Sequence, residues 1–228
     1  MNSNFSFQIS VVFDNKCVEE GFLPGFGFSA LIYNNSSQNY LLFDTGGNSR
    51  TLLHNIRKLN VDVSRIKKVI ISHNHSDHAG GLDGIYKINP NIEIYVPIAN
   101  LISYKKAFFK SKVYGISELT IIEKNVYSSG QFGRSFTKEH ALFLRTRNNE
   151  IIIIVGCAHP GLEKFILEAQ KLGKIKAIIG GFHGFNKFSY LNGIYLIGAC
   201  HCTQHTKSIR DKFPYQYQKI CVGNSFSF

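Results

Sequence analysis

The sequence predicts one α/β domain over residues 1–228, and three observations lead to that fold class. Short apolar segments typical of strands alternate with segments whose apolar residues recur at helical spacing. A length of 228 residues with 44% hydrophobic content suits one domain with its own core, and no linker divides the chain. In the second half, three strand-like segments each end in a loop with a histidine, and ligands in α/β proteins gather at the carboxyl ends of strands.

The first half of the chain begins with strand-like segments. Phe7–Phe13 is rich in β-forming residues, and Ser29–Tyr33 and Tyr40–Phe43 flank a polar turn, which predicts a hairpin. Apolar residues at helical spacing then predict a helix over Ser49–Asn60. We expect Ile66–Ser72 to be an apolar strand, covered on both faces, that ends at a cluster of histidines.

The second half follows the same order. Glu150–Val155 is a predicted buried strand, and Leu162–Leu172 is a predicted amphipathic helix closed by Gly173. Lys176–Ile179 and Ile194–Ile197 are two further predicted strands.

The stretch Tyr86–Lys138, between the halves, has a less regular pattern. Its segment Leu101–Tyr114 is basic and aromatic. We expect an amphipathic helix with a solvated lysine face there, and the alternative is an insertion that lines the substrate entrance.

The charge of the chain bears on its partners. A formal charge of +11, from 26 Lys+Arg against 15 Asp+Glu, favours a small-molecule substrate that is anionic, although a lysine-rich surface without a specific partner is the simpler interpretation. No arginine-rich tract or aromatic RNA-binding signature occurs, so a nucleic-acid partner is not expected. Without an apolar run of membrane length or a secretory leader, we expect a soluble cytoplasmic protein. The oligomeric state is left open.

The cysteines number five: Cys17, Cys157, Cys200, Cys202 and Cys221. The odd count argues against a disulfide framework, and the spacing of Cys200 and Cys202 is wrong for a zinc knuckle. We expect Cys17 and Cys221 to be small buried apolar residues.

The strongest functional signal is the segment that holds His73, His75, Asp77 and His78. Residues two apart share a face, so His73 and His75 can point to one position, with Asp77 and His78 pointing to a second. Imidazoles and a carboxylate suit zinc, as one or two ions, and also manganese or iron. Two such cations would polarise a carbonyl or phosphoryl group, and Asp77 could hold the attacking water.

This segment resembles the HxHxDH signature of the metallo-β-lactamase superfamily. Asp44 in Leu42–Gly46 and the pair Gly80-Gly81 extend the resemblance. Three later segments, Gly156–His159, Gly180–His183 and His201–Thr203, are similar to the GC[AS]H, GGFH and HCT elements of one subgroup. That subgroup is named 7,8-dihydropterin-6-methyl-4-(β-D-ribofuranosyl)-aminobenzene-5′-phosphate synthase-like, and the similarity runs from about Ile9 to the C-terminus.

The resemblance implies an αββα sandwich with the metals at one edge between two sheets. It also implies a ligand set, in which His159 joins His73 and His75 at the first cation. At the second cation, Asp77 and His78 are joined by either His183 or His201.

Two further positions follow from the same resemblance. Asp44 would orient a ligand imidazole rather than bind metal. Cys157 stands where relatives carry a bridging Asp, so its thiolate either replaces that ligand or simply packs beside the site.

The remaining histidines receive other interpretations. His140 is expected to be structural, and His54 to lie on the surface of a helix. His205 is a possible substrate contact.

The function expected from these residues is hydrolysis of an ester-type small molecule (a phosphoester, lactone or thioester) by a metal-activated water. A serine hydrolase is disfavoured because no GxSxG element occurs. The alternatives are the pterin-related synthase reaction of the subgroup, a nuclease, and a non-catalytic metal or ligand sensor.

Overall fold

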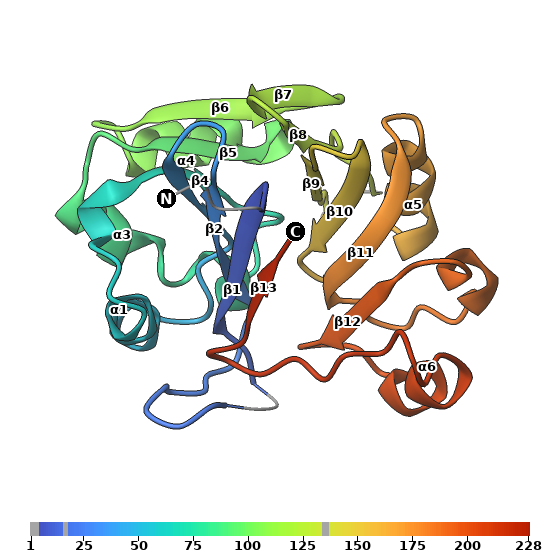
Figure 1. Ribbon diagram of the computed structural model, residues 1–228. Coiled ribbons are helices and arrows are strands. Elements are labelled where there is room, and N and C mark those ends of the chain that lie inside the picture. Colours follow the sequence, from blue (N-terminus) through green and yellow to red (C-terminus); the bar gives the residue numbers. More distant parts are fainter. Residues whose placement is uncertain (1–4, 16–17, 134–136) are drawn as a thin grey trace.

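The computed structural model describes residues 5–15, 18–133 and 137–228, which form two β-sheets packed face to face between outer layers of helices (Figure 1). The predicted αββα sandwich is therefore confirmed. Side chains of both sheets meet in one core: Ile9 and Phe43 come from the first sheet and Leu142 and Ile154 from the second, and all four are fully buried.

The first sheet runs in the order β13 (Ser225–Ser227), β1 (Phe7–Phe13), β2 (Ser29–Asn34), β3 (Asn39–Phe43), β4 (Ile66–Ile70), β5 (Glu93–Pro97) and β6 (Lys112–Ile116). β2 and β3 pair antiparallel as the predicted hairpin. β3, β4, β5 and β6 are parallel, which places their carboxyl ends at one edge of the sheet. The histidine cluster begins at that edge, three residues after the end of β4.

The second sheet runs in the order β12 (Leu196–Cys200), β11 (Lys174–Gly181), β10 (Glu150–Val155), β9 (Leu142–Arg145), β8 (Val126–Ser128) and β7 (Thr120–Glu123). β10, β11 and β12 are parallel, so the loops that follow them leave the sheet at the same edge. Those loops carry His159, His183 and His201.

The helices form the two outer layers of the sandwich (Figure 1). On the first sheet lie α1 (Ser49–Lys58), α3 (Leu82–Ile88) and α4 (Leu101–Ala107), and on the second lie α5 (Leu162–Gln170) and α6 (Thr206–Lys212). The shorter helical pieces are α2 (Ser76–Ala79), η1 (Val63–Arg65), η2 (Ile98–Asn100) and η3 (Phe188–Leu191).

Helix α1 shows how local sequence sets these boundaries. The side chain of Asn48 accepts a hydrogen bond from the Thr51 N–H at 2.9 Å and so caps the first turn. Leu52 and Ile56 pack against the sheet, which accounts for the predicted periodicity. The helix ends before the predicted Asn60 because that residue adopts a left-handed φ of 57°.

Two expectations, one for the first half and one for the stretch between the halves, need correction. The strand predicted over Ile66–Ser72 stops at Ile70, and its exposed Lys67 shows that it is not apolar throughout. The helix predicted over Leu101–Tyr114 ends at Ala107, after which the chain returns to the sheet as β6. Hydrogen bonding with the neighbouring strand β5 decides the conformation there, and the periodicity of one segment does not contain that information.

Cys221 also departs from expectation. It is buried, as predicted, but disulfide-bonded rather than a small apolar thiol. Cys17 lies outside the described residues. Cys157, Cys200 and Cys202 carry thiols, so an odd count of cysteines is compatible with a disulfide in this chain.

The described helices are too short or too polar to span a membrane.

Candidate metal centre

The candidate ligands lie where the carboxyl ends of the two sheets meet. The turn after β4 continues into α2 and carries His73, His75, Asp77 and His78. Across from it, the loops after β10 and β12 bring further imidazoles toward the same place. The turn after β4 and the loop after β10 are more than 70 residues apart in sequence. They converge because each follows a buried strand whose position is fixed by pairing with its neighbours in the sheet.

A first group consists of His73, His75 and His159, whose ligand atoms all lie within 4.8 Å of one another. Nε2 of His73 and Nδ1 of His75 are 3.0 Å apart. The His159 ring lies 4.6 Å from that of His73 and 5.1 Å from that of His75, measured between centroids.

A second group consists of Asp77, His78 and His201, under the same limit of 4.8 Å. Oδ2 of Asp77 lies 3.2 Å from Nε2 of His201 and 3.5 Å from Nε2 of His78. The two groups adjoin, since the rings of His73 and His78 are 4.2 Å apart.

The turn that carries these residues is held by close backbone contacts. The Phe28 N–H donates to the Asp77 carbonyl at 3.2 Å, and Thr45 Oγ1 donates to the His78 carbonyl at 2.9 Å. Gly27 allows the first of these contacts: with a φ of 139°, it sits where a Cβ would come within 2.1 Å of the Asp77 carbonyl oxygen.

Oxygen acceptors hold the Nδ1 side of three of these imidazoles. His78 donates to Asp44 Oδ2 at 2.7 Å, His159 to Glu139 Oε2 at 2.9 Å and His201 to Asn15 Oδ1 at 2.8 Å. A proton on Nδ1 leaves the lone pair on Nε2, the nitrogen that faces the group of candidate ligands.

His73 is oriented through Ser72. The Ser72 hydroxyl donates to Asp44 Oδ2 at 2.7 Å and can therefore accept from Nδ1 of His73, which lies 2.9 Å away. Asp44 thus contacts the His78 imidazole directly and the His73 imidazole through the Ser72 hydroxyl.

Glu139 is a site residue that the sequence analysis missed. Its fully buried carboxylate accepts the backbone N–H groups of Cys157, Ala158 and His159, each at 2.8 Å, besides Nδ1 of His159. It therefore fixes both the loop and the ring. Nothing in the sequence marked it, because it lies far from the loop along the chain and belongs to no motif.

The pKa shifts favour the cation-binding forms of His73, His75 and Asp77. Burial lowers the pKa of His73 well below its usual range, and burial together with His159 lowers the pKa of His75. Burial alone would raise the pKa of Asp77, but contact with His201 and the charge of His78 outweigh it and leave the pKa lowered. At His78, burial alone would lower the pKa, but the charge and hydrogen bond of Asp44 outweigh it and leave the pKa raised. Neutral imidazoles beside an ionised carboxylate are the ligand forms that metals require.

Two nitrogens of the donor set bear on whether it fits a cation. Nε2 of His201 is buried and, within the described part of the chain, has no hydrogen-bond partner. With its proton on Nδ1, toward Ser72, His73 carries a lone pair on Nε2, which lies 3.0 Å from Nδ1 of His75. A cation between these nitrogens would satisfy them, so the residues fit a metal at each group.

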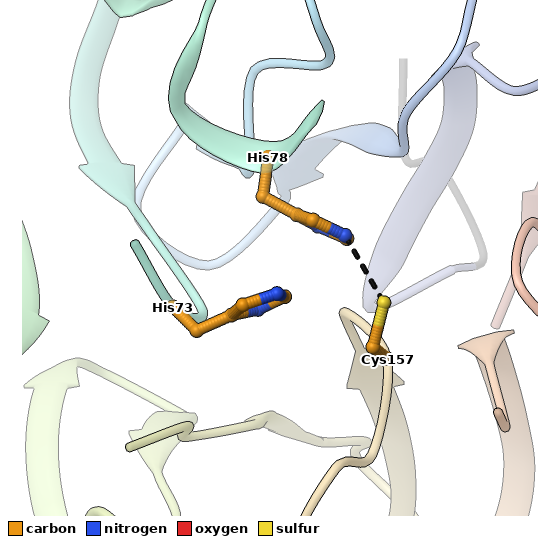
Figure 2. Close-up of side chains that lie close together, drawn as sticks. All are labelled: His73, His78 and Cys157. Carbon is orange, nitrogen blue, oxygen red and sulfur yellow. Dashed lines mark hydrogen bonds between the residues drawn. The ribbon is translucent and has the colours of Figure 1, made fainter. Parts of the chain in front are cut away.

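Two thiols lie beside the ligand groups: Cys157 adjoins both, and Cys202 adjoins the second. Sγ of Cys157 lies 3.2 Å from Nε2 of His78, and Figure 2 shows that the side chains of His73, His78 and Cys157 point toward one another. Cys202 forms a further group with Cys157 and His201. Contact with Cys157 lowers the pKa of Cys202, whereas contact with Cys202 and burial raise the pKa of Cys157.

Other histidines lie outside these groups. His183 is exposed, with its ring centroid 5.2 Å from that of His159. His140 is buried and bonded to Ser128 and to the Ile71 carbonyl, and His54 is exposed on α1. His205 is half-buried, and its ring packs near Phe188.

Four of the eight described non-glycine residues with positive φ lie at the edge where the ligands meet. Asp44, Ala158, His183 and His201 all adopt left-handed φ angles, between 43° and 57°. Non-glycine residues rarely hold this conformation unless their surroundings enforce it, and such strain clusters at functional sites.

A small cavity opens beside the first group. It has a volume of about 320 Å³ and is lined by the loop from Ala158 to Gly161 and by His183 to Lys187, with Glu163 between them. Lys187 and Glu163 form an ion pair of 2.6 Å at this cavity. A larger cavity of about 720 Å³ contains none of the candidate ligands.

Comparison with known proteins shows which family this chain is similar to. Residues 23–179 match the family model of the metallo-beta-lactamase superfamily. An uncharacterized protein of Methanocaldococcus jannaschii is 30% identical over 86% of this chain and 90% of its own length. A second protein of that organism, named 7,8-dihydropterin-6-methyl-4-(beta-D-ribofuranosyl)-aminobenzene-5'-phosphate synthase, is 25% identical over 90% of each chain. Among solved structures, the metallo-beta-lactamase fold protein YhfI from Bacillus subtilis superposes with a TM-score of 0.68 and 14% identity, covering 97% of this chain and 99% of its own.

Proposed function

Because the chain belongs to the metallo-beta-lactamase superfamily, whose members are mostly metal-dependent enzymes, we propose that it is a metal-dependent hydrolase of ester-type small molecules. Phosphoesters, lactones and thioesters are the substrate classes in question. The observation that carries the proposal is the convergence of two adjacent ligand groups, with a buried His201 Nε2 that has no hydrogen-bond partner among the described residues.

The roles of the residues follow from their placement. We assign His73, His75 and His159 to one cation, and Asp77, His78 and His201 to the other. Zinc suits this set best, and manganese or iron could replace it. Bound there, the cations would supply a water of lowered pKa and polarise the group under attack.

The protein's own side chains orient the reactants. Asp77 uses Oδ2 toward His78 and His201, which leaves its other oxygen to accept a hydrogen bond from the attacking water. Asp44 and Glu139 keep the protons of His78 and His159 on Nδ1, so these rings cannot turn away from the site.

The substrate pocket is proposed to be the cavity of about 320 Å³ beside His159. This volume lies at the lower end of small-molecule sites. His183 lines it outside the ligand groups, and we therefore assign His183 to substrate contact and His201 to the closing ligand position. The net charge of +11 would raise the local concentration of an anionic substrate.

The second candidate is a synthase reaction like the one named for the relative that is 25% identical over 90% of each chain. Such full-length similarity, with GC[AS]H-, GGFH- and HCT-type segments present, favours this alternative over a nuclease or a sensor.

The test combines metal analysis with a screen for hydrolysis. Protein loaded with zinc or manganese is offered chromogenic phosphodiesters, phosphomonoesters, lactones and thioesters. We expect turnover of at least one substrate class. His73→Ala and Asp77→Ala should each lower the turnover rate by more than about 100-fold, because each removes a proposed ligand of a cation. His54→Ala, on the exposed surface of α1, is the matched control and should retain full activity.

Other outcomes identify the rival functions. Cation binding without turnover of any ester would point to the synthase or to a sensor, and the two differ in whether a pterin and a phosphorylated aromatic partner are joined. Tight binding of RNA or DNA that weakens steeply with salt would indicate a nuclease.

A further inference from the structure

Cys157 holds a position that two ligand groups share. Its Sγ lies within 4.8 Å of ligand nitrogens of His73 and His78 in one group, and of ligand atoms of His201 and Cys202 in another. His73 belongs to the first cation position and His201 to the second, so this sulfur lies between the two.

The distances suit coordination. Ligand atoms around one tetrahedral zinc ion lie roughly 3.3–3.8 Å apart, given about 2.0 Å for zinc–nitrogen and about 2.3 Å for zinc–sulfur bonds. Sγ of Cys157 is 3.2 Å from Nε2 of His78. The ring proton of His78 is on Nδ1, where it is donated to Asp44, so Nε2 carries the lone pair. A lone pair and a sulfur therefore face one another.

Cys202 lies close to Cys157, with its Sγ 3.9 Å from the Cys157 carbonyl oxygen. Its side chain is half-buried, and its Sγ occupies space beside Gly181 that a Cβ there would fill, at 2.6 Å. It shares a candidate group with His201, whose buried Nε2 lies 3.2 Å from Asp77 Oδ2 but makes no hydrogen bond of good geometry within the described part of the chain.

We propose that Cys157 is a thiolate ligand that bridges the two cation positions, and that Cys202 supplies a second thiolate at the position of Asp77, His78 and His201. This inference rests on the metal centre of the proposed function. Each thiol releases its proton to solvent as the sulfur–metal bond forms, with no change of oxidation state. Sulfur donors favour soft cations, so the second position selects zinc or cadmium over manganese.

Cobalt(II) in place of zinc tests the proposal through absorption. Thiolate ligation of cobalt produces a near-ultraviolet charge-transfer band, whereas histidine and carboxylate ligation gives only weak visible bands. We expect the ultraviolet band in the wild type, a reduced band in Cys157→Ser and in Cys202→Ser, and none in the double variant. Cys200→Ala, a nearby thiol in the core between the sheets, is the matched control and should keep the full band.

The result that overturns the proposal is cobalt bound with visible bands only, or an ultraviolet band that persists in the double variant. Either would leave the proposed hydrolase site intact and remove the sulfur ligands from it. If cobalt does not bind at all, the proposed function fails together with this inference, so the two failures are distinguishable.

A second measurement covers the case in which Cys157→Ser fails to fold. Cys202→Ser alters a half-buried side chain and can be compared with wild type by competition between cadmium and manganese, read as bound metal per chain. The wild type should prefer cadmium, and the variant should lose at least about tenfold of that preference. An unchanged preference would exclude Cys202 as a ligand.

Discussion

The buried carboxylate of Glu139 offers a sharp test of how the His159 loop is held. Its Oε1 accepts the N–H groups of Cys157 and Ala158, and its Oε2 accepts two donors from His159, namely the backbone N–H and Nδ1. In Glu139→Gln, the amide oxygen can retain one pair of donors. The amide nitrogen must then face the other pair, and it cannot accept from either.

The cost follows from those two lost contacts. Hydrogen bonds to a charged group contribute about 1.5–3 kcal/mol each, and loss of one partner from a buried charged set typically costs about 3–5 kcal/mol. We therefore expect Glu139→Gln to lower the free energy of unfolding by about 3 kcal/mol or more. Because His159 would no longer be oriented, zinc affinity should also fall by about 10–100-fold.

The assay is urea denaturation of the metal-free protein, followed by zinc titration of the folded variant. Glu163→Gln is the matched control, because it removes a carboxylate whose lysine partner is exposed to water. An exposed pair of that kind contributes little. If Glu139→Gln is no less stable than Glu163→Gln, the account of the loop is wrong.

Two further predictions concern individual histidines. His201→Ala should bind one cation fewer per chain while His183→Ala keeps the wild-type number, measured by elemental analysis; the reverse result would exchange their assigned roles. Burial lowers the pKa of His140 to about 4 from its usual 6.5. As the pH falls, this histidine is therefore protonated in the unfolded chain before it is protonated in the folded protein. Burial of neutral His140 therefore contributes its full share to the free energy of unfolding above pH 6.5. About 3 kcal/mol of that free energy is lost as the pH falls from 6.5 to 4. The free energy of unfolding of metal-free His140→Gln should therefore fall less steeply over that range than that of the control His54→Gln, and equal slopes would refute the assignment.

Much of the fold could be predicted from the sequence because its central strands are long and apolar. Phe7–Phe13 and Glu150–Val155 were predicted with the bounds that the structure gives. The short strands β7, β8 and β9 were not, because each is three or four residues long and is defined by its antiparallel partner. Pairing between segments determines these strands, and a single segment carries no record of it.

The candidate site divides in the same way. The turn from His73 to His78 is local in sequence, so its residues could be recognised as a set. The choice between His183 and His201 could not be made, since it depends on a distant loop. Asp14 Oδ1 accepts the backbone N–H of His201 at 2.8 Å, and Asn15 holds its ring, which brings His201 toward Asp77.

The central claim is that six side chains from three loops surround two adjacent cations, and anomalous diffraction from zinc-loaded crystals tests it most directly. We expect two anomalous peaks at the zinc edge, one among His73, His75 and His159 and the other among Asp77, His78 and His201. A protein that binds zinc with no peak at either position, or with peaks only elsewhere on its surface, would contradict the account.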